Sequence, residues 1–169
     1  LPSNKLAVGL WLEADRMRGL QVNRANLENQ RDTVKQERRL AFDNRPYAMA
    51  IIERWPELAF RNWHNRHSII GSFEDLDAAK VAEVRRFFRT YYAPNNAVLA
   101  VTGDLRPEET RRLVEACFGD IPAQPLPAPP DLTEPPQRAP RTGVHSDPLA
   151  QVPAVIVGYP GPPRRTPDY

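Results

Sequence analysis

The sequence predicts an α+β fold of α/β layers, in which helices pack on a mainly antiparallel sheet. Before residue 92, apolar residues recur every three or four positions, which is the period of amphipathic helices. A continuous apolar and β-branched run at residues 97–102 has the length of a buried strand. A further helical segment at residues 107–119 lies between a proline and a glycine. Helix, strand and helix in this order favour layers of both element types.

The first two predicted helices span residues 3–19 and about 26–40. Ser3 is a candidate N-cap for the first of them, and Gly19 marks its end. Its expected packed face is formed by Leu6, Leu10, Ala14 and Met17. The second helix should lose regularity near Pro46, because a proline disfavours the α conformation of the residue before it.

The next segment, residues 55–72, contains a proline, a glycine and two tryptophans, and we expect a loop with irregular helical turns. A helix should then start at Ser72 or Asp75 and run to about Tyr92. Turns at residues 93–96 and 103–104 flank the predicted strand at residues 97–102.

Proline divides the chain: five of its 19 prolines lie in residues 1–121 and the other 14 in the last 48 residues. Consecutive prolines favour an extended polyproline spacer. A β-branched run at residues 152–158 then predicts a strand. We therefore expect three parts: the C-terminal part of an N-terminal domain at residues 1–122, a linker at 123–145, and the truncated start of a second, homologous domain at 146–169.

Composition excludes several classes of protein. A formal net charge of +2 gives no basic field that would argue for nucleic acid as a partner. Cys117 is the single cysteine, so no intrachain disulfide can form. No apolar run approaches the roughly 18 residues that a membrane-spanning helix needs. Because the sequence begins at Leu1 and stops just after a predicted strand, we interpret it as an excerpt of a longer protein.

The second predicted helix carries the candidate functional residue, Glu37. At 100° per residue, Glu37 falls near the middle of a sector of roughly 140° that also holds the apolar residues of this helix. A carboxylate in such a stripe must be paired, hydrogen-bonded, protonated or bound to a metal, because an isolated buried charge is costly. Two interpretations remain open: a structural ion pair with an arginine, and a metal or catalytic carboxylate. Gln30, two turns earlier on the same stripe, could hydrogen-bond to whatever Glu37 binds.

The remaining candidates are weaker. His64 and His67 have a spacing that could hold a metal on one helical turn, but the segment lacks helical periodicity and a neighbouring acid. His145 falls in the linker region, where we expect it to be solvated, and Cys117 is expected to act as a small apolar residue.

Four segments, in this order, resemble the pitrilysin/insulinase family of zinc metallopeptidases. The similarity covers about residues 1–122 without an evident gap, and the linker and following strand resemble the crossing into that family's second homologous domain. The segments are Leu12-Glu-Ala-Asp-Arg-Met17, Arg31-Asp-Thr-Val-Lys-Gln-Glu-Arg-Arg39, Ile69-Ile-Gly-Ser-Phe-Glu-Asp-Leu76, and Phe87 to Tyr92 followed by Ala-Pro-Asn-Asn-Ala-Val-Leu-Ala-Val-Thr-Gly-Asp104.

This resemblance implies a zinc site to which Glu37 contributes the third protein ligand. The family's inverted motif, His-x-x-Glu-His, supplies two histidine ligands and the general base, and it is absent from this chain, so it is expected upstream. At Gln30 active members tend to carry a second glutamate, so the amide here loses a supporting negative charge. The excerpt alone is therefore expected to be inactive and to fold poorly.

Three functions follow as alternatives. The first is a bacterial zinc endopeptidase that hydrolyses peptide bonds with a zinc-activated water, and of which this chain is a fragment. The second is a non-catalytic partner subunit of the same family, and the third is an α/β interaction module with a structural buried glutamate. The first two imply a peptide or unfolded-protein substrate and a second homologous domain or sister subunit. We expect the bacterial periplasm or cytoplasm, with the periplasm favoured.

Overall fold

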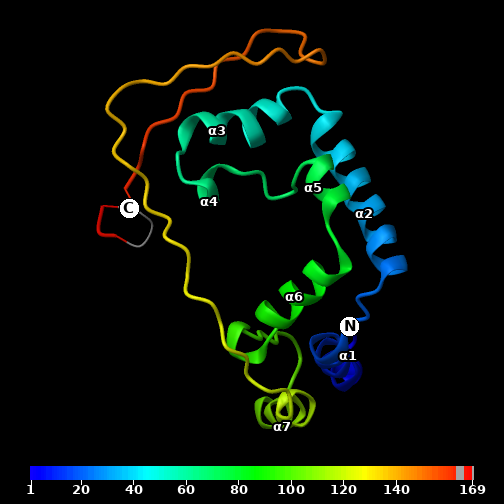
Figure 1. Cartoon of the computed structure of the whole chain (residues 1–169). Coiled ribbons are helices and arrows are strands. Elements are labelled where there is room, and N and C mark those ends of the chain that lie inside the picture. The colour runs from blue at the N-terminus through cyan, green and yellow to red at the C-terminus, as the bar shows by residue number, and fades with distance from the viewer. Residues whose placement is uncertain (163–165, 169) are drawn as a thin grey trace. The chain divides into compact units, whose positions relative to one another are not determined.

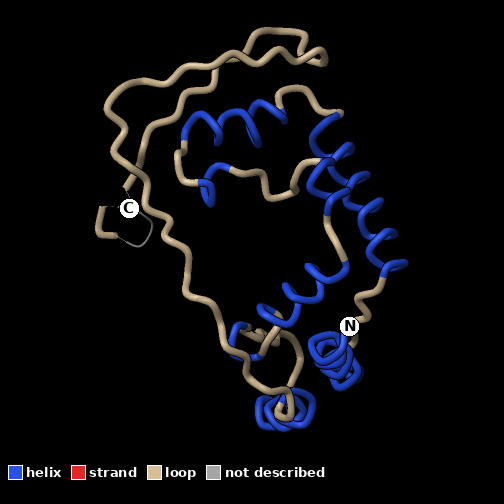
Figure 2. Tube along the Cα trace, viewed as in Figure 1, coloured by secondary structure: helices blue, strands red, loops and turns tan. Residues whose placement is uncertain are grey.

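The computed structural model describes residues 1–162 and 166–168, and the helix is the only regular element in this part of the chain (Figures 1 and 2). The α+β prediction is therefore wrong for this structure: no described residue belongs to a strand, and the helices pack on no sheet.

Neither predicted strand is formed, and both segments lack regular secondary structure. In the segment at residues 97–102, Val98 is 97% exposed, and in the segment at residues 152–158, Val155 is 87% exposed. A strand is completed by hydrogen bonds to a neighbouring strand, and no extended segment provides such a ladder within the described residues. The β-branched composition therefore did not predict a strand correctly in either segment, because the pairing that makes a sheet is missing within the described residues.

The described chain forms two compact units, and each is described by itself. The first comprises residues 1–30 and 78–129. Its helices are α1 (Leu6–Gly19), the first part of α2 (Arg24–Arg38), α6 (Val81–Tyr91) and α7 (Pro107–Phe118), with short 3-10 turns η1 (Ser3–Lys5) and η4 (Pro94–Asn96).

Packing of α1 against α7 forms the small core of this unit. The buried apolar residues Leu10 and Ala14 lie on the predicted face of α1. Arg18, near the end of α1, donates to the carbonyl oxygen of Cys117 at 2.6 Å and forms an ion pair with Asp120. Ser3 makes no capping hydrogen bond, so the helix begins through η1 instead.

The second unit comprises residues 31–77 and 130–169. It holds the second part of α2, the π-helices η2 (Arg39–Asp43) and η3 (Ala50–Arg54), and the helices α3 (Trp55–Ala59), α4 (Trp63–Arg66) and α5 (Phe73–Ala78). The irregular turns predicted for residues 55–72 are confirmed as α3 and α4. Loss of regularity after α2 is also confirmed, because the chain passes directly into a π-helix at Arg39.

The helix predicted from Ser72 to Tyr92 is split into α5 and α6. Ser72 accepts the amide hydrogen of Asp75 through its Oγ at 3.0 Å, which confirms the predicted start. Lys80 is extended, with φ −112° and ψ 150°, and its N–H donates to the Glu83 carboxylate at 2.8 Å. This capping interaction starts α6 as a separate helix.

The proline-rich segment forms no helix or strand within the described residues, and side chains hold its backbone. In the first unit, Asn95 both donates to and accepts from the backbone of Gln124, at 2.9 and 3.0 Å. In the second, Glu134 accepts from the N–H groups of Arg61 and Asn62, and Arg141 donates to two carbonyl oxygens at the end of α3. The segment is fastened within each unit rather than only spacing them.

Candidate functional site at the end of α2

Glu37 lies in the last turn of α2 with an exposed side chain. Within the described residues no hydrogen bond or ion pair engages its carboxylate. The expected burial in an apolar stripe is therefore not observed, and Leu40, another member of that stripe, is 67% exposed. A structural ion pair, the first interpretation of Glu37, is absent from the described part of the chain.

The face of α2 that packs inward is instead centred near Arg38. Arg31 donates through Nε to the carbonyl oxygen of Leu76 at 2.7 Å, and Lys35 forms an ion pair with Asp77 at 2.5 Å. Arg38 completes the row and donates to the carbonyl oxygen of Gly71. Three basic side chains at i, i+4 and i+7 thus hold α2 against the α5 segment, and the two helices lie side by side (Figure 1).

This row explains why the predicted face was displaced by about 90° around the helix. The helical wheel places Lys35 on the polar side of the helix and Arg38 outside the apolar sector. Arginine and lysine, however, can lay an apolar stem along a neighbouring helix while the charged end reaches a partner. Here Lys35 is only 18% exposed and Arg38 only 7%.

Arg38 is the most buried charged residue described, and its guanidinium meets several partners. Its Nη1 lies 2.7 Å from Glu53 Oε1, and its Nε lies 3.4 Å from Asp43 Oδ1. The ring of Phe73 lies 5.2 Å from the guanidinium carbon, within cation–π range. Two carboxylates, one carbonyl oxygen and one ring therefore surround a single positive charge.

This cluster fixes the orientation of the Arg38 side chain more than it stabilises the folded protein. A buried ion pair recovers its desolvation cost only when the remaining polar atoms are also satisfied, and here Asp43 Oδ2 and Arg38 Nε are both buried without a hydrogen-bond partner. Removing Arg38 would leave the partly buried carboxylates of Asp43 and Glu53 without the cation they share, and breaking a buried ion pair in this way costs about 3–5 kcal/mol in comparable cases.

Gln30 also lies on α2, seven residues before Glu37, and is exposed. Its suggested role in supporting the group that Glu37 binds stays a prediction.

The two histidines of the His-x-x-His pattern do not converge on a metal site. Trp63 lies between them: its ring stacks on His67 with centroids 4.0 Å apart and meets His64 edge-on at 5.2 Å. His67 Nδ1 is also 2.8 Å from the Trp63 carbonyl oxygen. Both histidine rings therefore pack against Trp63, and His67 also closes the short α4 turn through its contact with the Trp63 carbonyl oxygen.

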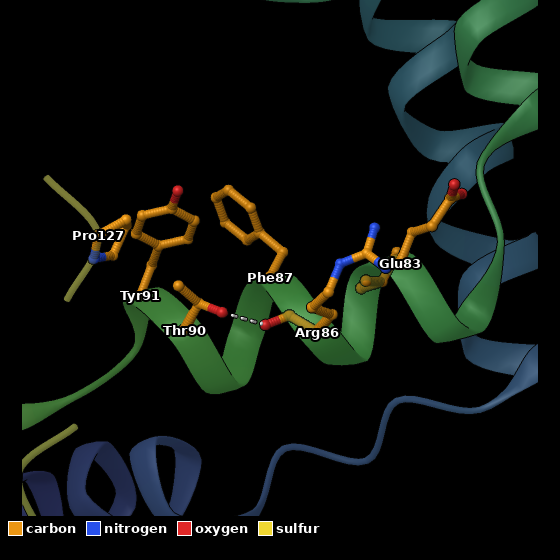
Figure 3. Close-up of a pocket in the computed structure, with 7 residues that line it drawn as sticks. Glu83, Arg86, Phe87, Thr90, Tyr91 and Pro127 are labelled. Atoms are coloured by element: carbon orange, nitrogen blue, oxygen red, sulfur yellow. Dashed lines mark hydrogen bonds between the residues drawn. The ribbon is translucent and has the colours of Figure 1, made fainter. Parts of the chain in front are cut away.

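A hollow of about 500 Å³ lies along α6 in the first unit (Figure 3). Phe87 and Tyr91 form its apolar wall, with ring centroids 4.7 Å apart, and Pro127 lies beside Tyr91. Thr90 is turned to the backbone, donating to the Arg86 carbonyl oxygen at 2.8 Å. The wall carries no convergent nucleophile and base, so the hollow offers a surface for contact rather than a site for chemistry.

A zinc site cannot be completed from the residues that the structure describes. They contain no group of three or more histidine, cysteine, aspartate or glutamate side chains that could hold a metal. Glu37 fits one position in such a site, because carboxylate oxygen is an accepted zinc ligand and this carboxylate is open and unpaired. No helix in the described part of the chain has the length and apolar character needed to cross a membrane.

Comparison with known proteins identifies the family of this chain. Residues 78–169 match the family model described as "Peptidase M16 inactive domain". The chain therefore belongs to the peptidase M16 family, which confirms the resemblance to the pitrilysin/insulinase zinc metallopeptidases.

The chain is also similar to one curated protein and to one solved structure. The chain is 28% identical over 154 residues to the zinc protease PqqE of Helicobacter pylori, with 89% of this chain and 34% of that protein covered. A solved structure, described as a protease from Helicobacter pylori, matches with a TM-score of 0.74 at 26% identity, covering 82% of this chain and 34% of the other. The chain thus spans about a third of the length of the relatives it matches.

Arg38 is the residue that sequence reasoning missed. It follows Glu37 directly and lies just outside the apolar sector on the helical wheel. This position beside the apolar sector was the one sequence feature that indicated burial of Arg38. Its partners Asp43 and Glu53 are two acidic residues within the next 15 positions, but only the folded turn brings them to one guanidinium.

Proposed function

We propose that this chain supplies Glu37 as the third protein ligand to the zinc ion of a bacterial zinc endopeptidase. This proposal rests mainly on one observation: the Glu37 carboxylate is exposed, and it lies in a helical turn that is fixed by the contacts of Arg38 with Glu53 and with the Gly71 carbonyl oxygen. Membership of the M16 family and the similarity to a protein named zinc protease support this assignment. Two histidine ligands and the general base would come from outside this chain.

Zinc with three protein ligands keeps a fourth position for water and lowers the pKa of that water toward ~7, which is the chemistry of peptide hydrolysis in this proposal. Within this chain, the part of Glu37 is to place one carboxylate oxygen and one negative charge. Gln30 would offer a neutral amide nearby, which can hydrogen-bond but adds no charge. The substrate would be a peptide or unfolded protein, enclosed together with a second homologous domain or sister subunit.

Two observations favour the non-catalytic partner subunit as a second candidate. Gln30 replaces the supporting glutamate, and the family model that matches residues 78–169 carries the description "inactive". In that case the protein would keep the fold and help to enclose substrate without binding zinc tightly. The α/β interaction module loses its basis, because Glu37 is exposed and no sheet is formed within the described residues.

Glu37→Gln in the full-length protein tests the first candidate. The amide keeps the size of the side chain but removes the negative charge, so zinc affinity should fall by more than the 10–100-fold typical of residues outside the ligand set. Zinc affinity is measured by competition with a chromophoric chelator, and peptide hydrolysis is followed in parallel.

Glu74→Gln is the matched control, since Glu74 is an exposed glutamate of α5 in the same unit. It should keep zinc affinity and hydrolysis within twofold of the parent protein. Equal zinc affinity in the parent and Glu37→Gln proteins would remove Glu37 from the ligand set. A full-length parent that binds no zinc would favour the partner subunit.

A further inference from the structure

We propose that Arg38 is a positioning residue for Glu37: it fixes the rotation of the last turn of α2, so that the Glu37 carboxylate projects from the open flank of the helix. This inference rests on the proposed function of Glu37 as a zinc ligand. It concerns how the chain orients that ligand.

The contacts of Arg38 come from three separate parts of the second unit. Glu53 belongs to η3, Asp43 to the end of η2, and the Gly71 carbonyl oxygen to the turn before α5. A side chain held from three directions has little freedom to rotate, and at 7% exposure it has little room. The backbone of α2 at residue 38 is therefore held in one orientation.

Helix geometry carries this restraint to the neighbouring residue. Consecutive side chains on an α-helix are separated by about 100°, so fixing Arg38 toward η3 and α5 directs Glu37 to the adjacent, open flank. Arg31 and Lys35 contribute to the same restraint earlier in the helix. Glu37 has no described partner of its own, so its direction depends on these neighbours.

The position of Arg38 at a helix junction makes the restraint important. Arg38 is the last residue of α2, and the π-helix η2 starts at the next residue. A π-helical turn adds a residue to each turn and shifts the register of the side chains that follow. The Arg38 contacts hold the junction at this residue, which keeps Glu37 within regular α-helix.

The role requires arginine rather than a positive charge alone. The planar guanidinium presents several N–H groups in fixed directions and can bind two carboxylates and a carbonyl oxygen at once. A lysine ammonium at this position keeps the charge but cannot reach all three from one point.

Arg38→Lys, Glu37→Gln and the double variant, all in the full-length protein, test the proposal as a double-mutant cycle. We expect Arg38→Lys alone to weaken zinc binding by about tenfold, as for other residues that orient a metal ligand. In the Glu37→Gln background, Arg38→Lys should change zinc affinity by less than twofold, because the ligand that it orients is gone. Arg39→Lys is the matched control, since Arg39 is exposed and lies against the same Phe73 ring at 5.1 Å; it should leave zinc affinity unchanged.

Glu53→Gln provides a second, milder variant that keeps a hydrogen-bond acceptor for Arg38, and we expect a smaller loss of zinc affinity than the roughly tenfold loss in Arg38→Lys. The proposal is overturned if Arg38→Lys and Glu53→Gln bind zinc like the parent while Glu37→Gln does not. It is also overturned if Arg38→Lys costs the same factor in both backgrounds, which would show a general effect on folding. Loss of the Glu37→Gln effect itself would instead overturn the proposed function.

Discussion

Arg38 and Glu37 are adjacent in sequence and have opposite environments. The arginine is buried because two carboxylates and a carbonyl oxygen meet its guanidinium, whereas the glutamate is open because α2 turns it away from those partners. The apolar stripe on the helical wheel predicted that Glu37 is buried, whereas Arg38 is the buried member of this pair. The wheel does not include the partners of Arg38, which lie up to 33 residues away along the chain.

Glu134 gives a prediction at the same scale. Its carboxylate accepts hydrogen bonds from Asn65 Nδ2 at 2.7 Å and from the N–H groups of Arg61 and Asn62. Hydrogen bonding from Asn65, then from these backbone groups, lowers the pKa of Glu134 below its usual value. Because the folded pKa lies below the unfolded one, the stabilisation is complete above about pH 4.3 and is lost as the pH falls through the folded pKa.

We therefore expect the hydrogen bonds from Arg61 and Asn62 to Glu134 to weaken in acid, below about pH 4, while the contacts made by Arg141 remain. Hydrogen exchange at the amides of Arg61 and Asn62 should accelerate as the pH falls from 5 to 3, after correction for intrinsic exchange. Glu134→Gln should give weak protection that no longer varies with pH. Protection that is the same at both pH values in the parent protein would contradict the assigned role of the carboxylate.

At the scale of elements, the turn before α5 depends on Gly71. Its φ of +78° lies in the left-handed region, and its carbonyl oxygen accepts from Arg38. No atom lies within 4 Å of the position that a Cβ would take, so the cost of a side chain is conformational rather than steric.

Gly71→Ala should lower the stability of the full-length protein by about 1–2 kcal/mol, the usual cost of the left-handed conformation for a residue with a side chain. Urea denaturation followed by circular dichroism measures the change. Gly19→Ala is the control, because Gly19 ends α1 with equal free space and without a positive φ; it should be neutral or slightly stabilising. Equal midpoints for the two variants would show that the turn does not depend on glycine.

Most helices could be predicted because their signals are local. The face of α1 with Leu10 and Ala14, the Ser72 cap and the proline that opens α7 are all properties of neighbouring residues. The sheet could not be decided in this way: Val98 and Val155 lie in β-branched segments, but a strand also needs a distant partner, and both side chains are exposed. The inward face of α2 failed for the same reason: Arg31, Lys35 and Arg38 are buried by the α5 segment and not by their own hydrophobicity.

At the scale of the whole molecule, the described helices bury very little apolar surface. The buried apolar residues are Leu10, Ala14 and Ala93, and no large side chain described is fully buried. Local hydrogen bonds and ion pairs therefore carry more of this structure than a hydrophobic core does.

This balance predicts the behaviour of the isolated 169-residue chain. Folding must offset about 1–2 kcal/mol of backbone entropy per residue, and surface ion pairs contribute at most about 1 kcal/mol each. With so little apolar burial, the chain should retain helical far-ultraviolet dichroism but melt without a sharp cooperative transition, and it should bind a hydrophobic dye. Adding zinc should not shift the melt, because the described residues contain no group of three or more histidine, cysteine, aspartate or glutamate side chains that could hold a metal ion. A single steep transition of the isolated chain, without dye binding, would show that these helices form a self-sufficient core and would contradict this prediction. The full-length protein should show such a transition if its remaining segments cover the exposed side chains of Val98, Phe87 and Leu40.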